Sequence, residues 1–239
     1  MISGDLLAAV RSHAAECYPD ECCGLIVETA AGLCYRPCRN SDLFPARQFT
    51  VDPLDWVSAE ESGVIRIVCH SHPNRAPQPS DADKLGCEQS GLQWLIVSVP
   101  GDAWTMLAPS GFSAPLIGRD FVWGVFDCYT LLRDYYRDVV GITLPAAEPY
   151  SYNFWKNGQA LYEQRLEQFG FITLAQDQAL QAHDVLLIQI RSTIANHAAI
   201  YLGDGQLLHH LESQLSRRDI YGGFWQKNTR FIARHNLLC

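Results

Sequence analysis

A single break in the apolar patterning, at "APSGFSAPLIGRD" (108–120), constrains the fold of this chain more than any other feature. Two prolines, two glycines and two serines interrupt this segment, which is the composition of a linker. A chain of 239 residues can form one large domain or two domains of ordinary size with separate cores. The break favours two domains, which we place at residues 1–112 and 113–239.

The composition predicts a soluble globular protein. Hydrophobic residues make up 48% of the chain, yet no segment has the run of about eighteen apolar residues that a membrane span needs. The first residues, "MISGDLLAAVRSHAAECY", predict an amphipathic helix rather than a signal peptide, so we expect synthesis in the cytoplasm. The nine cysteines are odd in number and irregularly spaced, which predicts buried thiols and not a disulfide framework.

The charge argues against a nucleic-acid partner. The net charge is −8, and residues 1–113 carry 14 acidic and seven basic side chains, whereas residues 114–239 carry 12 and 11. Binding to phosphates needs concentrated positive charge, which neither part of the chain offers.

Hydrophobic periodicity predicts a mixed α/β first domain and an α+β second domain. In the first domain we expect helices at 3–16, 53–62 and 80–91, and strands at 23–28, 33–37, 64–72, 92–99 and 104–109. In the second we expect helices at 127–140 and 159–168, a strand at 185–190, a hairpin over 197–210 and a final strand at 229–235. A Gly-Asp-Gly triplet supplies the hairpin turn.

The stretch "HSHPNRAPQPSDAD" (70–83) combines ligand-type side chains at the end of a predicted strand. Side chains alternate along a strand, so His70 and His72 emerge on one face, about 7 Å apart along the chain. Asp83 follows a proline-rich loop that can fold back, and it would complete three ligands of a zinc site with one open position. The alternative is structural, because Ser80 and Asp83 also have the spacing of a helix capping box.

The wider pattern resembles the JAMM (MPN) metalloprotease family. Its signature is an upstream glutamate, then His-Ser/Thr-His, seven residues, Ser, two residues and Asp, and this chain supplies every element in that spacing. The resemblance implies an α/β fold of the cytidine-deaminase-like type, with zinc held by His70, His72 and Asp83. It also implies Glu21 as the general base and Ser80 as a support for the developing oxyanion.

A second set of reactive side chains lies in the other domain. Cys128 begins a predicted helix, where backbone N–H groups and the helix dipole favour a thiolate and lower its pKa. His197 begins a strand whose hairpin partner carries His209, so a cysteine, a base and an orienting residue of papain type can meet. The alternative is again structural, since a lone cysteine is more often a packing residue and strand-end histidines are often surface residues.

These segments resemble the NlpC family of papain-like peptidases. The family pattern is W-G-x-x-D-C before a helix, followed by H-x-x-I-Y-L-G-x-G and a histidine. Matching positions are Trp123, Gly124, Asp127, Cys128, His197, Ile200, Tyr201, Leu202, Gly203, Gly205 and His209. The resemblance covers roughly residues 115–239 and implies a Cys128–His197–His209 peptidase that cuts peptidoglycan stem peptides, typically between γ-D-glutamate and diaminopimelate.

Three positions depart from the NlpC pattern, and a fourth competes with one of its members. Phe121 stands where family members often have a tyrosine, and Tyr129-Thr130 replaces Ser-Gly after the cysteine. His210 is the alternative third residue, although on a strand it would point away from the face that holds His209.

The order of the two domains resembles tail assembly proteins of bacteriophages and prophages with long non-contractile tails. This resemblance implies synthesis in the host cytoplasm and a role at the tail tip, with peptidoglycan in the periplasm or other tail proteins as partners. Three hypotheses stay open: a bifunctional peptidase, a cell-wall hydrolase whose JAMM domain regulates or docks, and an assembly factor whose sites are not used on the cell wall.

Overall fold

The computed structural model describes residues 2–146, 152–175 and 178–239, which form two compact units, 1–114 and 115–239. The helices and strands of the first unit are α1 (Gly4–Cys17), β1 (Cys23–Thr29), β2 (Gly32–Cys38), α2 (Pro53–Ser62), β3 (Val64–Pro73), α3 (Asp81–Ser90), β4 (Gln93–Val99) and β5 (Trp104–Leu107). All eight elements predicted for this unit are present, with their ends displaced by one or two residues.

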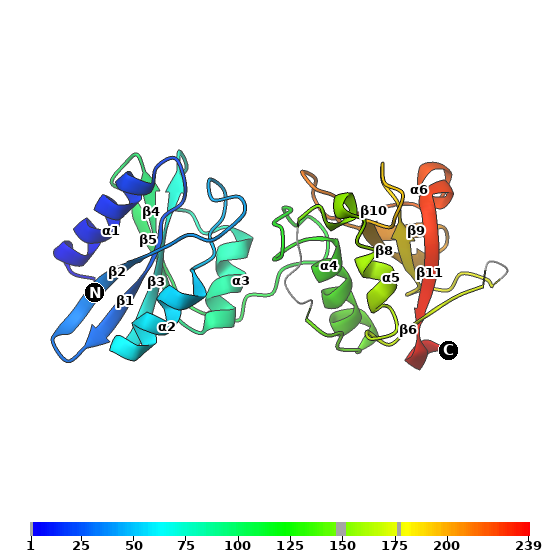
Figure 1. Cartoon of the computed structure of the whole chain (residues 1–239), viewed down its shortest axis with the longest axis horizontal. Coiled ribbons are helices and arrows are strands. Elements are labelled where there is room, and N and C mark those ends of the chain that lie inside the picture. Colours follow the sequence, from blue (N-terminus) through cyan, green and yellow to red (C-terminus); the bar gives the residue numbers. More distant parts are fainter. Residues whose placement is uncertain (1, 147–151, 176–177) are drawn as a thin grey trace. The chain divides into compact units, whose positions relative to one another are not determined.

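A five-stranded sheet in the order β2-β1-β3-β4-β5 forms the centre of the first unit. Only β3 and β4 run parallel, and the loop, α3 and turn that join them carry the chain from one end of the sheet back to the other. The strand β1 alternates between the two faces: Ile26 packs in the cluster that contains α1, and Leu25 packs in the cluster that contains α2 and α3. Figure 1 shows α1 on one side of the sheet and α2 and α3 on the other.

The second unit is built on a six-stranded antiparallel sheet in the order β10-β9-β8-β7-β11-β6. Its elements are α4 (Cys128–Tyr135), a π-helical turn (Tyr136–Val140), a 3₁₀ turn (Phe154–Asn157), α5 (Leu161–Arg165), β6 (Phe171–Thr173), β7 (Val185–Ile188), β8 (His197–Gly203), β9 (Gln206–His209), β10 (Arg217–Ile220), α6 (Gly223–Asn228), β11 (Thr229–His235) and a 3₁₀ turn (Asn236–Leu238). The helix α4 packs on β8 and β9 over the main core of this unit.

The sequence-based expectations for the second unit were less accurate. The helix predicted at 127–140 changes from α-helical to π-helical geometry after Tyr135, and Gly141 ends it in the left-handed conformation. The helix predicted at 159–168 is reduced to the five residues of α5. Neither β6, β10 nor α6 was predicted, because segments of three to six residues are too short to show a recognisable periodicity.

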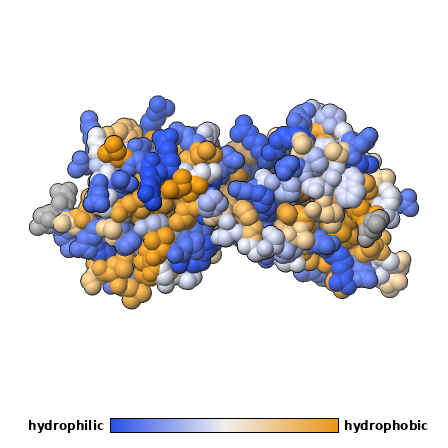
Figure 2. Space-filling model, turned by 180° about the vertical axis from the view of Figure 1, so that it is seen from behind, coloured by the Kyte–Doolittle hydropathy of each residue, from blue (hydrophilic) through white to orange (hydrophobic). Residues whose placement is uncertain are grey.

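The cysteines agree with the expectation of buried thiols without a disulfide framework. All nine cysteines are free and six of them are buried. Apolar side chains such as Leu54 and Ile220 also reach the surface, and Figure 2 shows orange apolar residues among the blue hydrophilic ones on the face that it draws. Among the residues that the structure describes, no helix is long and apolar enough to cross a membrane.

A close contact between α3 and β4 fixes the distance of the helix from the sheet. A Cβ atom on Gly86 would lie 2.5 Å from the ring of Trp94, which also packs against the imidazole of His70. We therefore predict that Gly86→Ala destabilises the protein by about 1–3 kcal/mol through overpacking. Alanine normally stabilises a helix by about 0.5–1 kcal/mol relative to glycine. The change in the free energy of unfolding, measured with urea, should therefore have the opposite sign to the one that helix propensity predicts. The exposed neighbour Gln89→Ala is the control, and equal stabilisation by both variants would contradict this contact.

Candidate functional sites

The end of β3 brings two imidazoles together in the interior of the first unit. As strand alternation requires, His70 and His72 lie on one face, with their Nε2 atoms 3.2 Å apart. Ser71 lies on the other face, where its hydroxyl accepts a hydrogen bond of 2.8 Å from the backbone N–H of Cys22. Both imidazoles are buried and so are sheltered from water.

The first turn of α3 adds a carboxylate to the imidazole pair. Asp83 places one oxygen 3.2 Å from Nε2 of His70 and the other 3.3 Å from Nε2 of His72. Ser80 is the N-cap of α3, and a full capping box joins it to Asp83. The capping box and the candidate ligand set therefore coexist, because Asp83 accepts from Ser80 and faces the imidazoles at the same time. In this structure the Ser80 hydroxyl donates its hydrogen to Asp83 and not to a substrate. Its role in stabilising an oxyanion therefore stays a prediction.

The donor set fits a metal ion. His70, His72 and Asp83 each offer one ligand atom, and these three atoms lie within 4.8 Å of one another. The Nδ1–H of His72 donates to the carbonyl of Ala76 at 3.1 Å, so in the neutral imidazole Nε2 is the nitrogen that can bind a metal ion. A cation bound between the two imidazole nitrogens and the carboxylate would stabilise them at such short range. Zinc accepts two nitrogens and one oxygen as ligands.

The electrostatics of this cluster favour an ionised Asp83. Although burial opposes ionisation, the two imidazoles and the Ser80 hydroxyl hold the pKa of Asp83 well below its usual range. Glu21 behaves differently. Burial raises the pKa of its carboxyl group, against the opposing effects of His70 and His72. The two buried carboxyl groups of the site thus have pKa values pushed in opposite directions, as is common where one acid binds and another transfers protons.

Glu21 is held just before β1 by its own backbone. Its N–H donates to the carbonyl of Pro45 at 2.7 Å, and the side-chain amide of Asn40 donates to its carbonyl oxygen at 3.0 Å. Its buried side chain accepts a hydrogen bond of 2.7 Å from the half-exposed guanidinium of Arg75. Arg75 lies in the loop between His72 and Ser80, and motif spacing gave no reason to select it.

In the second unit, Cys128 begins α4 as predicted. Asp127 is the N-cap, and a capping box with Thr130 fixes the first turn of the helix. Thr130 thus has a structural reason to stand where the NlpC pattern has another residue. Tyr129, the other departure, donates a hydrogen bond of 2.7 Å to the carbonyl of Pro145.

The hairpin of β8 and β9 pairs the two predicted histidines. Nε2 of His197 lies 3.3 Å from Nδ1 of His209, and both side chains are buried. This leaves Nδ1 of His197 as the nitrogen not engaged by His209. His210 is also buried, and its ring contacts Phe121 edge-on at 5.2 Å, so His210 takes no part in the pairing.

The thiol environment differs from the one expected for a helix N-terminus. Sγ of Cys128 lies 3.0 Å from the hydroxyl of Tyr162, and among the described residues it makes no hydrogen bond to an imidazole. Burial raises the pKa of Cys128 to about 11 and lowers the pKa of His197 to about 3. The expectation of a lowered thiol pKa is therefore wrong for this conformation, because desolvation outweighs the helix dipole. The resting pair is a neutral thiol and a neutral imidazole.

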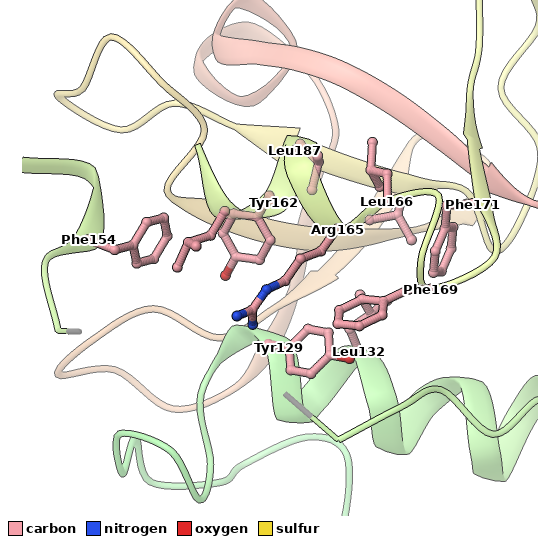
Figure 3. A pocket seen from close by; sticks show the side chains of 11 residues that line it. Tyr129, Leu132, Phe154, Tyr162, Arg165, Leu166, Phe169, Phe171 and Leu187 are labelled. Carbon is pink, nitrogen blue, oxygen red and sulfur yellow. The ribbon is translucent and has the colours of Figure 1, made fainter. Parts of the chain in front are cut away.

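A pocket lies beside Tyr162, between α4, α5 and β7. Aromatic and aliphatic side chains line it, as Figure 3 shows. Arg165, one turn along α5 from Tyr162, is the charged residue of the lining. The sequence offered no signal for Tyr162 or for this pocket, since α5 lies outside both motifs.

Two known protein families match successive parts of the chain. Residues 3–107 match the prokaryotic homologs of the JAB domain, and residues 118–234 match the NlpC/P60 family. The fold and the two sites thus define a two-domain protein in which a JAB/MPN-like domain precedes an NlpC/P60 domain.

Two relatives resemble the chain across both domains. The tail tip assembly protein K of Escherichia phage N15 is 38% identical over 229 residues, which span 95% of this chain and 93% of that protein. The protein of the same name from Escherichia phage lambda is 42% identical over 185 residues, which span 77% of this chain and 89% of the relative. The chain belongs to the family of tail tip assembly protein K.

The Tyr162 contact predicts how the thiol reacts. Because a donated hydroxyl hydrogen stabilises a thiolate, Tyr162→Phe should slow alkylation of Cys128 by iodoacetamide about tenfold at pH 8. Mass mapping gives the rate at each cysteine, so the remaining eight thiols serve as internal references. Tyr221→Phe, which removes a hydroxyl elsewhere in the same unit, is the control. Faster labelling of Cys128 in Tyr162→Phe would mean that the tyrosine only shields the sulfur.

Proposed function

We propose that this chain is a tail-tip protein with two hydrolytic sites. The N-terminal site would be a zinc-dependent peptidase or isopeptidase, and the C-terminal site a Cys–His–His endopeptidase that cuts peptidoglycan stem peptides. The observation that carries the proposal is the approach of His70, His72 and Asp83 to one another in the first unit, together with the His197–His209 pair and the buried Cys128 in the second. Membership of the family supports the tail tip as the location, and the NlpC/P60 match supports a hydrolase in the second unit.

In the first unit, His70, His72 and Asp83 would hold the metal ion. When bound, zinc supplies a Lewis acid that polarises a carbonyl group and makes water more acidic. Glu21 would act as the general base and return the proton to the leaving amine, for which its raised pKa is suited. The hydrogen bond from Arg75 to Oε1 holds the carboxylate of Glu21 in one orientation. Oε2 would then be the oxygen that accepts the proton.

The metal site predicts a clear difference between two neighbouring aspartates. Asp83→Asn should lower zinc content from about one equivalent to near zero, because it removes the anionic ligand. The matched control is Asp81→Asn, in the same turn of α3, whose carboxylate pairs with Lys84 instead. Elemental analysis of metal-replete protein measures both. Glu21→Gln should keep the zinc but lose hydrolysis, and a wild-type protein without zinc would sink the proposal.

In the second unit, the reaction would begin with proton transfer from Cys128 to His197. The thiolate attacks the carbonyl carbon of the scissile amide, and the imidazolium returns its proton to the departing amine, which leaves an acyl-enzyme. Water, deprotonated by His197, then releases the acid product and restores the thiol. His209 would hold the imidazole of His197 in orientation through the 3.3 Å contact.

The cell-wall reaction is tested with purified sacculi and the full chain. Wild-type protein should release fragments that end in γ-D-glutamate, and Cys128→Ala should release none. His209→Ala should reduce the rate less than His197→Ala, because orientation is a weaker demand than proton transfer. Glu21→Gln is the control, since it disables the other site and should leave this release unchanged.

One observation favours a second candidate, the processing of a tail protein. Apart from Arg165 and the tyrosine hydroxyls, the pocket beside Tyr162 has an apolar lining, whereas stem peptides carry several carboxylates. A protein substrate with an apolar side chain would match that lining better. Inertness towards sacculi, together with a tail protein that stays uncut in particles made with Cys128→Ala, would establish this function in place of cell-wall cleavage.

A further inference from the structure

One nitrogen of the imidazole pair has no hydrogen-bond partner. Nε2 of His209 is buried, and among the described residues no acceptor or donor lies within hydrogen-bond distance of it. The nearest charged oxygen is Oδ2 of Asp219, 4.0 Å away on the neighbouring strand β10. An unpaired buried polar group is costly, so this gap calls for an explanation.

The fold holds Asp219 on the face of the sheet that carries His209. In the antiparallel register Arg217 is opposite His209, so Asp219 is its diagonal neighbour on the same face. The indole N–H of Trp225 donates to Oδ2 of Asp219 at 3.1 Å, and the ring of Trp225 packs edge-on against His209 at 4.6 Å. The backbone N–H of Ile220 donates to the other carboxylate oxygen at 2.8 Å.

The chemistry of the pair requires one tautomer of His209. When His197 takes up a proton, its Nε2–H must donate to Nδ1 of His209, which can accept only if that nitrogen is bare. A neutral imidazole with a bare Nδ1 carries its hydrogen on Nε2, the atom that faces Asp219. In the other tautomer His209 would donate to His197, and the proton of Cys128 would have no favourable destination.

We propose that Asp219 is a positioning residue, whose carboxylate holds His209 as the Nε2–H tautomer and thereby aligns His197 with Cys128. The inference rests on the proposed thiol chemistry of the second unit. Hydrogen bonds of this kind are often long before substrate binds and shorten in the reacting complex.

The charges around Asp219 support an anionic carboxylate at neutral pH. Burial acts in the opposite direction, but the hydrogen bonds from Ile220 and Trp225 lower the pKa of Asp219, and so do the nearby His209 and Arg217. Arg217 reaches the same oxygen at 3.7 Å, so the carboxylate is flanked by a cation on its solvent side. An anion beside a buried N–H group favours the tautomer that points this hydrogen towards it.

The first test reads the tautomer directly and needs no substrate. In full-length protein labelled with ¹⁵N-histidine, imidazole ¹⁵N shifts should show His209 with hydrogen on Nε2, the signal being assigned from its loss in His209→Gln. Asp219→Ala should move the population towards the Nδ1–H form, and Asp219→Glu should restore it, since a longer side chain still reaches the nitrogen. The control is Asp204→Asn in the β8–β9 turn, which removes an exposed carboxylate and should change nothing.

The second test links the tautomer to the thiol. Asp219→Ala should slow alkylation of Cys128 roughly tenfold at neutral pH, and Asp219→Glu should recover most of the rate. If Asp219→Ala fails to fold, Asp219→Asn carries the test with the side-chain shape preserved, and it should also lower the Nε2–H population. The same tautomer in wild type and in both neutral variants would overturn the inference. Failure to cleave sacculi with these results intact would count against the cell-wall function alone.

Discussion

Desolvation of titratable side chains is the constraint on which both units depend. Moving a titratable side chain out of water costs free energy unless other groups compensate. The chain buries seven such side chains at its candidate sites: Glu21, His70, His72, Asp83, Cys128, His197 and His209. Hydrogen-bond partners meet part of this demand: the capping serine of α3 donates to Asp83, whereas in the second unit the hydroxyl of Tyr162 contacts Cys128 and the two imidazoles contact each other. The polar clusters pack directly against aromatic side chains: Phe49 and Trp94 contact His70, and Trp225 contacts His209.

The two clusters are in opposite electrostatic states. In the first unit short contacts to imidazoles keep Asp83 ionised, so charge is concentrated before any substrate arrives. In the second unit burial keeps Cys128 and His197 uncharged, so charge separation must accompany the reaction. The partners of each group differ accordingly: Asp83 faces two imidazoles at 3.2 and 3.3 Å, whereas Cys128 contacts the neutral hydroxyl of Tyr162.

Local sequence predicted the parts of the sites that short-range geometry controls. Strand alternation placed His70 and His72 on one face, the Ser80 spacing predicted the cap of α3, and the Gly-Asp-Gly turn predicted the hairpin that pairs His197 with His209. Tyr162 and Asp219 could not be found in this way, since Tyr162 is 34 residues from Cys128 and Asp219 lies on β10, a strand that was not predicted. The direction predicted for the pKa shift of Cys128 was wrong because a helix N-terminus can be recognised from local sequence, whereas the degree of burial depends on the packing of the whole unit.

The neutral state of Cys128 has a consequence for the lifetime of the nucleophile. Oxidants attack a thiolate far faster than a thiol, and the first oxidation product of cysteine is readily carried to irreversible forms. A sulfur that is 8% exposed and holds its proton at neutral pH is therefore protected from peroxide while no substrate is bound.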